Sequence, residues 1–346
     1  MGDTLISISP RDDRAWRQVE KLLEGEGIRR DANLDYTCGI FDENDRLIAT
    51  GSSFGNTLRC FAVDASRQGE GLLNRIITHL LRHQAERGYY HLFVYTKCRT
   101  ARFFQDAGFH EIVRVDGALS LLENRRDGFR NFCAEMEGFR REGRSAVAVM
   151  NANPFTLGHR HLVERAAAEN DWVHLFVLGE EAGPIPFAVR WRLATEGVAD
   201  LKNVICHPSG PYIISSATFP SYFFRDEEAV IHGHARLDLA LFRSIAGALG
   251  AEARYVGEEP ASVVTGIYNR VLAEELPAAG IRCVIVPRRE HGGAAISAST
   301  VRRAIHDGRL AEIRGLVPDV TWDYFNSPEA VPVIEAIRDC GSAVHY

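Results

Sequence analysis

Residues 146–169 read AVAVMNANPFTLGHRHLVERAAAE, and this stretch decides the fold of the second half of the chain. The apolar run that ends at Met150 predicts a strand, and a helix is expected to begin near Thr156. Strand, loop and helix in this order place a helix N-terminus at the carboxyl edge of a parallel sheet, where open N–H groups and the helix dipole favour an anion. Gly158 allows close backbone approach and His159 supplies a donor, so the stretch predicts a phosphate site.

Length and composition predict a two-domain globular protein. The chain has 346 residues, which is long for one hydrophobic core. The formal net charge of −6 argues against a nucleic-acid partner. No run of 18 apolar residues and no signal-peptide pattern occurs, so we expect no membrane partner. The 7 cysteines are scattered and never spaced as C-x-x-C, which favours a reducing cytoplasm over a disulfide framework or a zinc site.

The first half of the chain predicts a mixed α/β domain over residues 1–122. Alternating and apolar runs predict strands at 5–9, 37–41, 47–53, 58–63, 90–95 and 111–115. Helices are expected at 14–23, 72–87 and 99–107. Between a strand and the second helix, residues 64–73 read DASRQGEGLL, a glycine-rich turn that is typical of an anion cradle.

This order of elements resembles the GNAT-type N-acetyltransferase fold, in which such a turn holds the pyrophosphate of acetyl-CoA. Gln68 and Gly71 fit the family's turn, and residues 103–109 (FFQDAGF) resemble its later helix-to-strand segment. Leu73 stands where the family has Gly or Ala, and its branched side chain would crowd a cofactor phosphate. The resemblance therefore implies either a GNAT-like module that no longer transfers acetyl groups or one that still binds acetyl-CoA.

A charged segment at 123–144 is expected to be a connecting helix, followed by a second domain at 145–346. In this domain strands are predicted at 146–150, 172–178, 204–207, 229–232, 253–256 and 282–286. Helices are predicted at 159–169, 187–199, 237–249, 266–276 and 298–306. Strands that alternate with helices imply a Rossmann-like parallel sheet that binds ligands at its carboxyl edge.

A second candidate phosphate motif, ISASTVR, occupies residues 296–302. Ser297 is a plausible N-cap for the helix that follows, and by itself it would be read only as a cap. Ser299 and Arg302 lie three residues apart, on one helical face beside open N–H groups. A hydroxyl and a guanidinium in this place would bind phosphate oxygens.

The two motifs together resemble the nucleotidyltransferase superfamily, which carries (H/T)-x-G-H and I-S-x-T/S-x-x-R signatures. That resemblance implies direct attack on the α-phosphate of ATP with pyrophosphate as leaving group, so catalysis is positioning and charge stabilisation. Thr156 and His159 would act at the α-phosphate, and Gly158 would provide clearance. Asn153, Phe155, Ser297, Ser299 and Arg302 would complete the ATP site, and Mg²⁺ would bridge the phosphates.

Further segments resemble the citrate lyase ligase family, which also has a GNAT-like first domain. They are NPFTLGH at 153–159, YIISSATFPSY at 212–222, RLDL at 236–239, RYVGEEP at 254–260 and ISAS at 296–299. The resemblance implies that ATP and acetate form acetyl-adenylate. The acetyl group would then pass to the thiol of the phosphoribosyl-dephospho-CoA prosthetic group on the acyl carrier subunit of citrate lyase.

Other candidates keep two interpretations each. Residues 212–222 either line the acetate or prosthetic-group pocket or form a packed surface loop. Arg190 and Arg192 either reach phosphate or are solvated. Glu258, Glu259, Pro260, Tyr268 and Asn269 sit where a substrate could meet the sheet edge, and a glutamate there could help hold Mg²⁺. His232 and His234 lack an evident third ligand, so we assign no metal site.

Two alternative functions stay open at this point. One is a small-molecule adenylyltransferase of the phosphopantetheine or nicotinamide mononucleotide type, against which the additional first domain and residues 212–222 argue. The other is an acetyl-CoA-binding acetyltransferase or sensor, against which Leu73 and the intact pair of phosphate motifs argue.

Overall fold

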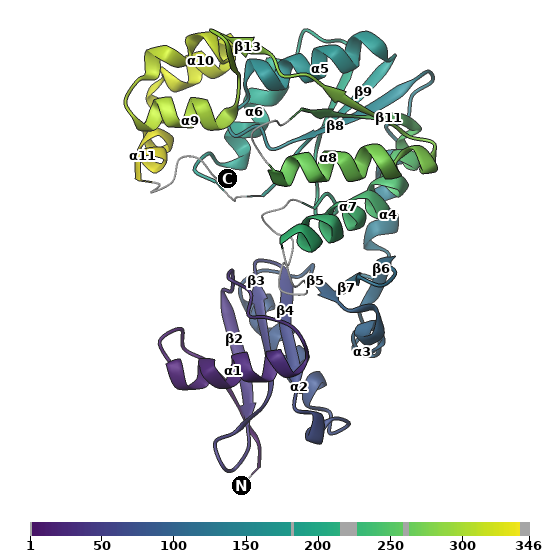
Figure 1. The fold of residues 1–346 in the computed structure, drawn as a ribbon, viewed down its shortest axis with the longest axis vertical. Helices are drawn as coiled ribbons and strands as arrows, with labels where there is room; N and C mark the ends of the chain where they lie inside the picture. Colours follow the sequence, from purple (N-terminus) through teal and green to yellow (C-terminus); the bar gives the residue numbers. More distant parts are fainter. Residues whose placement is uncertain (1, 181–182, 215–226, 259–262, 340–346) are drawn as a thin grey trace. The chain divides into compact units, whose positions relative to one another are not determined.

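The computed structural model describes residues 2–180, 183–214, 227–258 and 263–339. The chain divides into two compact units. The first unit comprises Met1–Asn131 with Phe219–Ala240, and the second comprises Phe132–Thr218 with Leu241–Tyr346. The α/β class predicted for both halves is confirmed (Figure 1). Each unit has its own sheet and its own hydrophobic core, so each is described separately.

The first unit contains a 7-stranded mixed sheet with the order β1-β2-β3-β4-β5-β7-β6. Neighbouring strands are antiparallel except β4 and β5, which are parallel. This sheet with its parallel pair and the helix after β4 gives the GNAT-like α/β fold that the sequence predicts. The strands are β1 (Thr4–Ser7), β2 (Tyr36–Phe41), β3 (Leu47–Phe54), β4 (Thr57–Val63), β5 (Phe93–Thr96), β6 (His110–Val115) and β7 (Leu119–Glu123).

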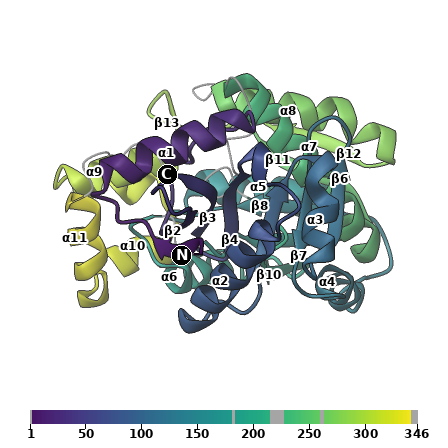
Figure 2. The ribbon, with the colours of Figure 1, turned by 90° about the horizontal axis from the view of Figure 1, so that it is seen from below.

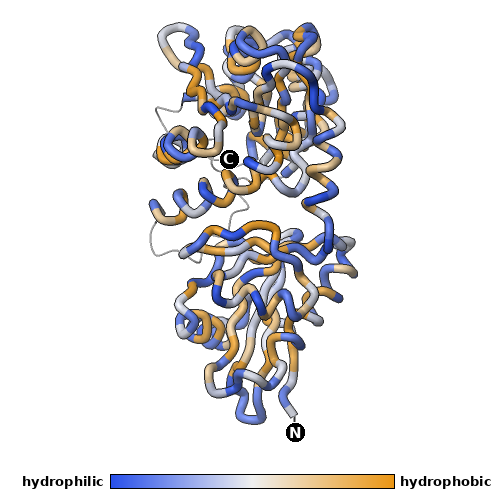
Figure 3. Tube along the Cα trace, turned by 90° about the vertical axis from the view of Figure 1, so that its right-hand side faces the viewer, coloured by the Kyte–Doolittle hydropathy of each residue, from blue (hydrophilic) through white to orange (hydrophobic). Residues whose placement is uncertain are grey.

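Helices cover both faces of this sheet. Helix α1 (Asp13–Gly25) packs its buried residues in one core cluster, whereas α2 (Leu72–Glu86) and α3 (Ala101–Asp106) contribute to another. Figure 2 shows α1 and α2 on opposite sides of strands β2 to β4. Figure 3 shows apolar segments along the strands of this sheet, as expected for strands buried on both faces. Short 3₁₀ turns η1 (Ala65–Arg67) and η2 (Cys98–Thr100) precede α2 and α3.

The second unit contains a 5-stranded parallel sheet with the order β10-β9-β8-β11-β12. The first strand in sequence lies at the centre, and the order reverses between β8 and β11. Ligands of such Rossmann-like sheets bind at the carboxyl ends of the strands at this switch point. The strands are β8 (Ser145–Met150), β9 (Trp172–Val177), β10 (Val204–Pro208), β11 (Ala251–Gly257) and β12 (Arg282–Val286), with a small hairpin β13 (Glu290–His291) and β14 (Ala294–Ala295).

The later part of the chain contains the remaining helices, of which only some contribute to the second core. They are α4 (Gly128–Glu137), α5 (Leu157–Glu169), α6 (Phe187–Gly197), α7 (Glu227–Leu249), α8 (Val263–Glu275), α9 (Ala298–His306), α10 (Asp319–Phe325) and α11 (Val331–Asp339), with 3₁₀ turns η4 (Pro277–Ala279), η5 (Leu310–Gly315) and η6 (Pro328–Ala330). The core joins strand residues with α5, α6, α9 and the C-terminal helices. Within the described ranges, no helix has both the length and the apolar character needed to cross a membrane.

Several predicted elements were wrong. Residues 229–232 are not a strand but part of α7, because a short apolar run does not distinguish strand from helix and the flanking sequence is rich in Ala and Leu. The charged segment 123–144 is helical only at α4, and its first residue, Glu123, ends β7, a strand that the sequence did not predict. Helices α10 and α11 were not predicted either.

Candidate active site

The loop between β8 and α5 ends in a strong helix cap. Thr156 has extended backbone geometry, and its hydroxyl oxygen accepts a hydrogen bond from the His159 amide at 3.3 Å. His159 returns the interaction, because its Nδ1 accepts from the Thr156 amide at 3.1 Å. This reciprocal pair is a capping box in which a histidine takes the place usually held by Glu or Gln. The cap fixes the imidazole at the start of α5.

The cap also fixes the tautomer of His159. A backbone N–H can only donate, so Nδ1 is the unprotonated nitrogen and a neutral imidazole carries its proton on Nε2. Nε2 makes no hydrogen bond to the part of the chain that the structure describes. Burial, followed by the charges of Arg288 and Arg302, lowers the pKa of His159 to about 4. At neutral pH this side chain is therefore an uncharged donor.

The second motif caps the neighbouring helix in a similar way. Ser297 is the N-cap of α9, and its hydroxyl accepts from the Thr300 amide at 3.0 Å. The same hydroxyl lies 2.8 Å from the hydroxyls of both Ser299 and Thr300. Three hydroxyl groups thus gather at a helix start, beside the N–H groups of the first turn. This arrangement suits phosphate oxygens, which need several donors.

The structure brings the two motifs together, although they are far apart in the sequence. Arg302 is 2% exposed, and its Nη1 donates to the Asn153 carbonyl oxygen at 2.5 Å. A Cβ placed on Gly158 would lie 3.0 Å from the Ile296 carbonyl oxygen. The absence of a side chain at Gly158 therefore lets α5 approach the loop before α9. Through its bond to the Asn153 carbonyl oxygen, Arg302 holds the loop before α5 in place.

Arg288 is a functional candidate that the sequence analysis did not identify. It follows β12, and its Nη1 donates to the Ile296 carbonyl oxygen at 3.1 Å while its Nε donates to the Glu258 carbonyl oxygen at 2.7 Å. Among the charged neighbours of His159, it lowers the pKa most. Its place just after the last parallel strand was the available signal, since that is where this sheet presents ligand-binding residues.

Two residues predicted to bind ATP lie in the interior. The ring of Phe155 is fully buried in the core and stacks on His159, with 5.8 Å between centroids. Asn153 is 3% exposed, and its Oδ1 is a buried acceptor with no hydrogen bond among the described residues. Its amide group lies against Gly183, where a Cβ would meet Nδ2 at 2.3 Å. These contacts make Phe155 a support for the imidazole, while Asn153 keeps an acceptor inside the loop.

Of the two arginines on α6, Arg190 is buried, whereas the side chain of Arg192 is 40% exposed, as its solvated interpretation expects. Arg190 is 1% exposed and donates to backbone carbonyls of loop residues, namely Asn151, Leu178, Glu180 and Ile185. A guanidinium is the side chain best able to satisfy so many carbonyls at once. Arg192 pairs with Glu329 at 3.0 Å and lies over the Tyr324 ring. Arg190 therefore orders the loops at the edge of the sheet, and Arg192 joins α6 to α10 and η6.

The remaining candidates are only partly described. Of residues 212–222, the structure describes Tyr212, Ile213 and Ile214, and all three are buried. The rest of this segment, with Glu259 and Pro260, lies outside the described residues. The Asn269 amide donates to the Gly257 carbonyl oxygen, and the Tyr268 hydroxyl accepts from Arg254. Both therefore have structural partners.

The described residues offer no protein cage for Mg²⁺. Within residues 2–180, 183–214, 227–258 and 263–339, no three His, Cys, Asp or Glu side chains are grouped to hold a metal ion. The groups shown to act on His159 are the hydroxyl of Thr156 and the guanidinium groups of Arg288 and Arg302, and guanidinium groups bind phosphate oxygens rather than a cation. A magnesium ion that arrives with ATP would take its ligands chiefly from the phosphates and water.

Comparisons with known proteins identify the family. The model of the citrate lyase ligase C-terminal domain matches residues 145–325. The chain is 40% identical over 312 residues to the citrate (pro-3S)-lyase ligase of Klebsiella pneumoniae, and the alignment covers 88% of this chain and 91% of that ligase. It is 36% identical over 336 residues to the corresponding ligase of Escherichia coli, with 94% of each covered.

The solved structures that resemble part of this chain include acetyltransferases. A GNAT-family acetyltransferase from Staphylococcus aureus is 11% identical with a TM-score of 0.30, covering 36% of this chain and 100% of that one. Glucosamine-6-phosphate N-acetyltransferase from Arabidopsis thaliana is 15% identical with a TM-score of 0.27, and the match covers 34% of this chain and 97% of that one. Family membership rests instead on the match over the second unit and on relatives that align along nearly the whole chain. The chain belongs to the citrate lyase ligase family, whose members are enzymes.

Proposed function

We propose that this chain activates acetate with ATP and transfers the acetyl group to the thiol of the prosthetic group on the acyl carrier subunit of citrate lyase. The relatives are named as ligases of citrate lyase, which supports this choice of partner. The observation that carries the adenylation step is the neutral Nε2–H of His159, whose ring the cap holds in place and whose pKa is lowered by burial and by the charges of Arg288 and Arg302. The six described cysteines are free thiols, in keeping with a cytoplasmic setting.

In the first step an acetate oxygen attacks the α-phosphorus of ATP, the bond to the bridging oxygen breaks, and pyrophosphate leaves. His159 would donate from Nε2 to an α-phosphoryl oxygen as its negative charge grows. Thr156 would hold the imidazole in this orientation. The hydroxyls of Ser297 and Ser299, with the positive charge of Arg302, would stabilise the departing pyrophosphate.

In the second step the thiol sulfur of the carrier attacks the acetyl carbonyl carbon of acetyl-adenylate. The bond from that carbon to the AMP oxygen breaks, AMP leaves, and the thiol proton passes to solvent. The product is a thioester on the carrier. The same site therefore has to bind ATP and then release AMP once the acetyl group is transferred. A site built mainly from donors to phosphate oxygens suits both steps.

ATP–pyrophosphate exchange tests the first step. We expect exchange that depends on acetate and that phosphopantetheine or nicotinamide mononucleotide does not support. The product can be checked directly, because acetylated carrier gains the mass of one acetyl group only when ATP, acetate and carrier are all present. Exchange that ignores acetate but responds to a nucleotide-like acceptor would overturn the proposal in favour of a small-molecule adenylyltransferase.

A further inference from the structure

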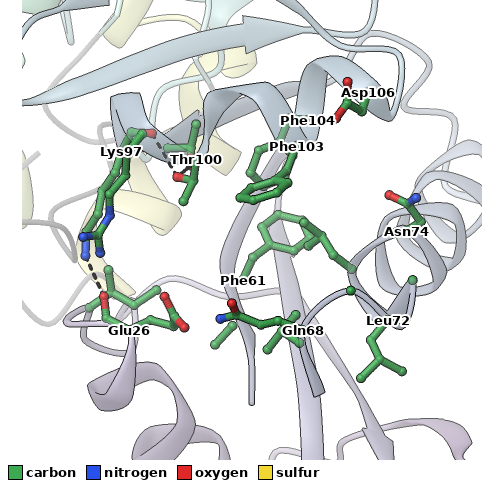
Figure 4. Close-up of a pocket in the computed structure, with 18 of the residues that line it drawn as sticks. Glu26, Phe61, Gln68, Leu72, Asn74, Lys97, Thr100, Phe103, Phe104 and Asp106 are labelled. Carbon is green, nitrogen blue, oxygen red and sulfur yellow. Dashed lines mark hydrogen bonds between the residues drawn. The ribbon is translucent and has the colours of Figure 1, made fainter. Parts of the chain in front are cut away.

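The hairpin β13–β14 joins the last strand of the parallel sheet to the second phosphate motif. It directly precedes Ser297, the N-cap of α9, so it lies next to one of the two helix starts that are proposed to bind ATP. The pocket drawn in Figure 4 is lined by residues of the first unit, among them Lys97 and Phe103. The hairpin belongs instead to the second unit, together with both phosphate motifs.

The hairpin is short and its geometry is well defined. Each strand has two residues, and the turn between them consists of Gly292 and Gly293, with φ of 59° and 79°. Positive φ at both central residues gives the two-residue turn that matches the twist of a hairpin, and glycine adopts it without steric cost. The Ile296 amide extends the pairing by donating to the Arg289 carbonyl oxygen at 2.9 Å. Arg289 therefore lies opposite Ile296 at the base of the hairpin.

One face of the hairpin is directed at the start of α5. Residues opposite each other in an antiparallel pair project from the same face, so the side chains of Arg289 and Ile296 share one face. Ile296 is 2% exposed. A Cβ built on Gly158, in the first turn of α5, would lie 3.7 Å from the Ile296 Cβ. The face that carries Arg289 is therefore turned toward the helix start that holds His159.

The tip of the hairpin is held on the same side. His291 is two residues from Arg289 and thus on the same face of the strand. Its imidazole lies beside Gly315, where an added Cβ would meet Nε2 at 2.5 Å. The next residue, Leu316, accepts a hydrogen bond through its carbonyl oxygen from the Leu157 amide at 2.9 Å. Base and tip of the hairpin are thus both held against segments that contact the first turn of α5.

Arg289 is an exposed cation beside this helix start. Within the part of the chain that the structure describes, its guanidinium makes no hydrogen bond and no ion pair. The preceding Arg288, by contrast, donates to two carbonyl oxygens. The charges that lower the pKa of His159 are those of Arg288 and Arg302, as expected if Arg289 lies farther from the imidazole. An arginine at the rim suits the outer phosphates of a triphosphate better than the α-phosphate beside His159.

We propose that Arg289 is a further substrate-binding residue, which the hairpin holds beside the phosphate site so that its guanidinium binds the two outer phosphates of ATP. This assignment rests on the proposed function, in which those two phosphates leave as pyrophosphate. A guanidinium forms two parallel hydrogen bonds to phosphate oxygens, and its charge is permanent. Arg289 would therefore contribute to the binding of ATP and pyrophosphate but not to that of AMP, which carries only the α-phosphate.

Calorimetry on the full-length protein with inorganic pyrophosphate and Mg²⁺ tests this role without any chemical step. Arg289→Ala should weaken pyrophosphate binding by about tenfold or more, because a charge-assisted contact is lost, and should leave AMP binding within about twofold. Arg289→Lys keeps the charge but not the paired donors, so its affinity for pyrophosphate should fall between those of the wild type and Arg289→Ala.

Arg303→Ala is the matched control. Arg303 is also exposed and has no hydrogen bond or ion pair to the described residues, but it lies on α9 beyond the hairpin. Its replacement should leave pyrophosphate binding within about twofold. Pyrophosphate affinity that is equal in the wild type and Arg289→Ala, or undetectable in both, would overturn the assignment. Equal losses in Arg289→Ala and Arg303→Ala would overturn it too, because they would show only a general effect of positive charge.

Steady-state kinetics give a second readout. In Arg289→Ala the KM for ATP should rise by about tenfold, while the KM for acetate should stay within about twofold. An unchanged KM for ATP would contradict the role of Arg289. Failure of the proposed function is visible separately: a wild type that binds pyrophosphate through Arg289 but shows no acetate-dependent exchange would keep this binding residue and lose acetate as the acceptor.

Discussion

His159 has a structural role that determines its chemistry. Its Nδ1 completes the cap of α5, and this leaves the Nε2 proton as the group that can face a ligand. Phe155 stacks behind the ring, and burial, followed by the charges of Arg288 and Arg302, lowers the pKa of His159, so the imidazole is neutral near pH 7. In the proposed mechanism, a neutral donor would stabilise the developing phosphoryl charge without forming an ion pair that would hold the product.

Replacing His159 should therefore affect chemistry more than folding. We expect His159→Ala to lower acetate-dependent exchange by about a hundredfold or more, because a preorganised donor is lost. His159→Gln is the matched variant, since the glutamine amide can both accept a hydrogen bond from Thr156 and donate one. Its exchange rate should fall between those of the wild type and His159→Ala. Thermal unfolding of each variant shows whether the protein is folded. Near-normal exchange in folded His159→Ala would remove this residue from the mechanism.

The depressed pKa of His159 makes a separate prediction about pH. With the pKa lowered to about 4, the ring is neutral throughout the physiological range. The ratio of exchange rates of the wild type and His159→Gln should then stay constant from about pH 6 to about pH 8, because other titrating groups cancel in the ratio. A ratio that changes about tenfold with a midpoint near pH 6.5 would show that the imidazolium is the active form.

At the scale of elements, the site depends on how closely α5 approaches the loop before α9. Gly158→Ala adds a Cβ 3.0 Å from the Ile296 carbonyl oxygen, which is main chain and cannot rotate away. We expect exchange to fall by about tenfold, because the two phosphate-binding helix starts are pushed apart. Gly247→Ala is the control, since this helical glycine has open space around it and the added methyl favours helix. Equal rates in both variants would contradict the close approach.

A pair of histidines joins β9 and β10 in the second core. His174 and His207 lie 2.9 Å apart, and burial lowers the pKa of both to about 4. The unfolded chain takes up protons below about pH 6.5 whereas the native pair does not, so stability is present above that pH and is lost as the pH falls toward 4. For each histidine, the free energy of unfolding should fall by roughly 2 kcal/mol as the pH is lowered from about 7 to about 5.

Denaturant unfolding at several pH values measures this loss. His207→Gln keeps a hydrogen-bonding side chain but removes one titrating group, so its unfolding free energy should depend less on pH than that of the wild type. His161→Gln, in a partly exposed position on α5, should leave the dependence unchanged. A wild-type stability that does not change between about pH 7 and about pH 5 would contradict buried neutral histidines.

The sequence predicted what is local and missed what depends on distant contacts. The N-cap at Ser297 and the helix start near Thr156 follow from residue type and position, and both are confirmed. The bond from Arg302 to the Asn153 carbonyl oxygen joins residues 149 positions apart, which no local pattern reveals. Arg190 was expected either to reach phosphate or to be solvated, and for the same reason the sequence did not reveal that it is buried and donates to loop carbonyls. The wrong strand at 229–232 came from reading three apolar residues without their helical flanks.

At the scale of the whole molecule, the residues proposed to bind ATP all lie in the second unit. Activation of acetate would then need only the donors of this unit. Acetyl-adenylate should therefore form before, and without, any thiol acceptor.

Trapping the intermediate tests this order of steps. With ATP, acetate and hydroxylamine but no carrier, we expect acetohydroxamate and AMP to appear in equal amounts, because hydroxylamine attacks the acetyl carbon of acetyl-adenylate in place of the thiol. His159→Ala should lower this yield about as strongly as it lowers exchange, roughly a hundredfold, whereas Phe103→Ala, which removes a 42% exposed ring from α3 in the first unit, should leave it unchanged. Pyrophosphate release that requires the carrier even with hydroxylamine present would mean that the thiol takes part in the first step.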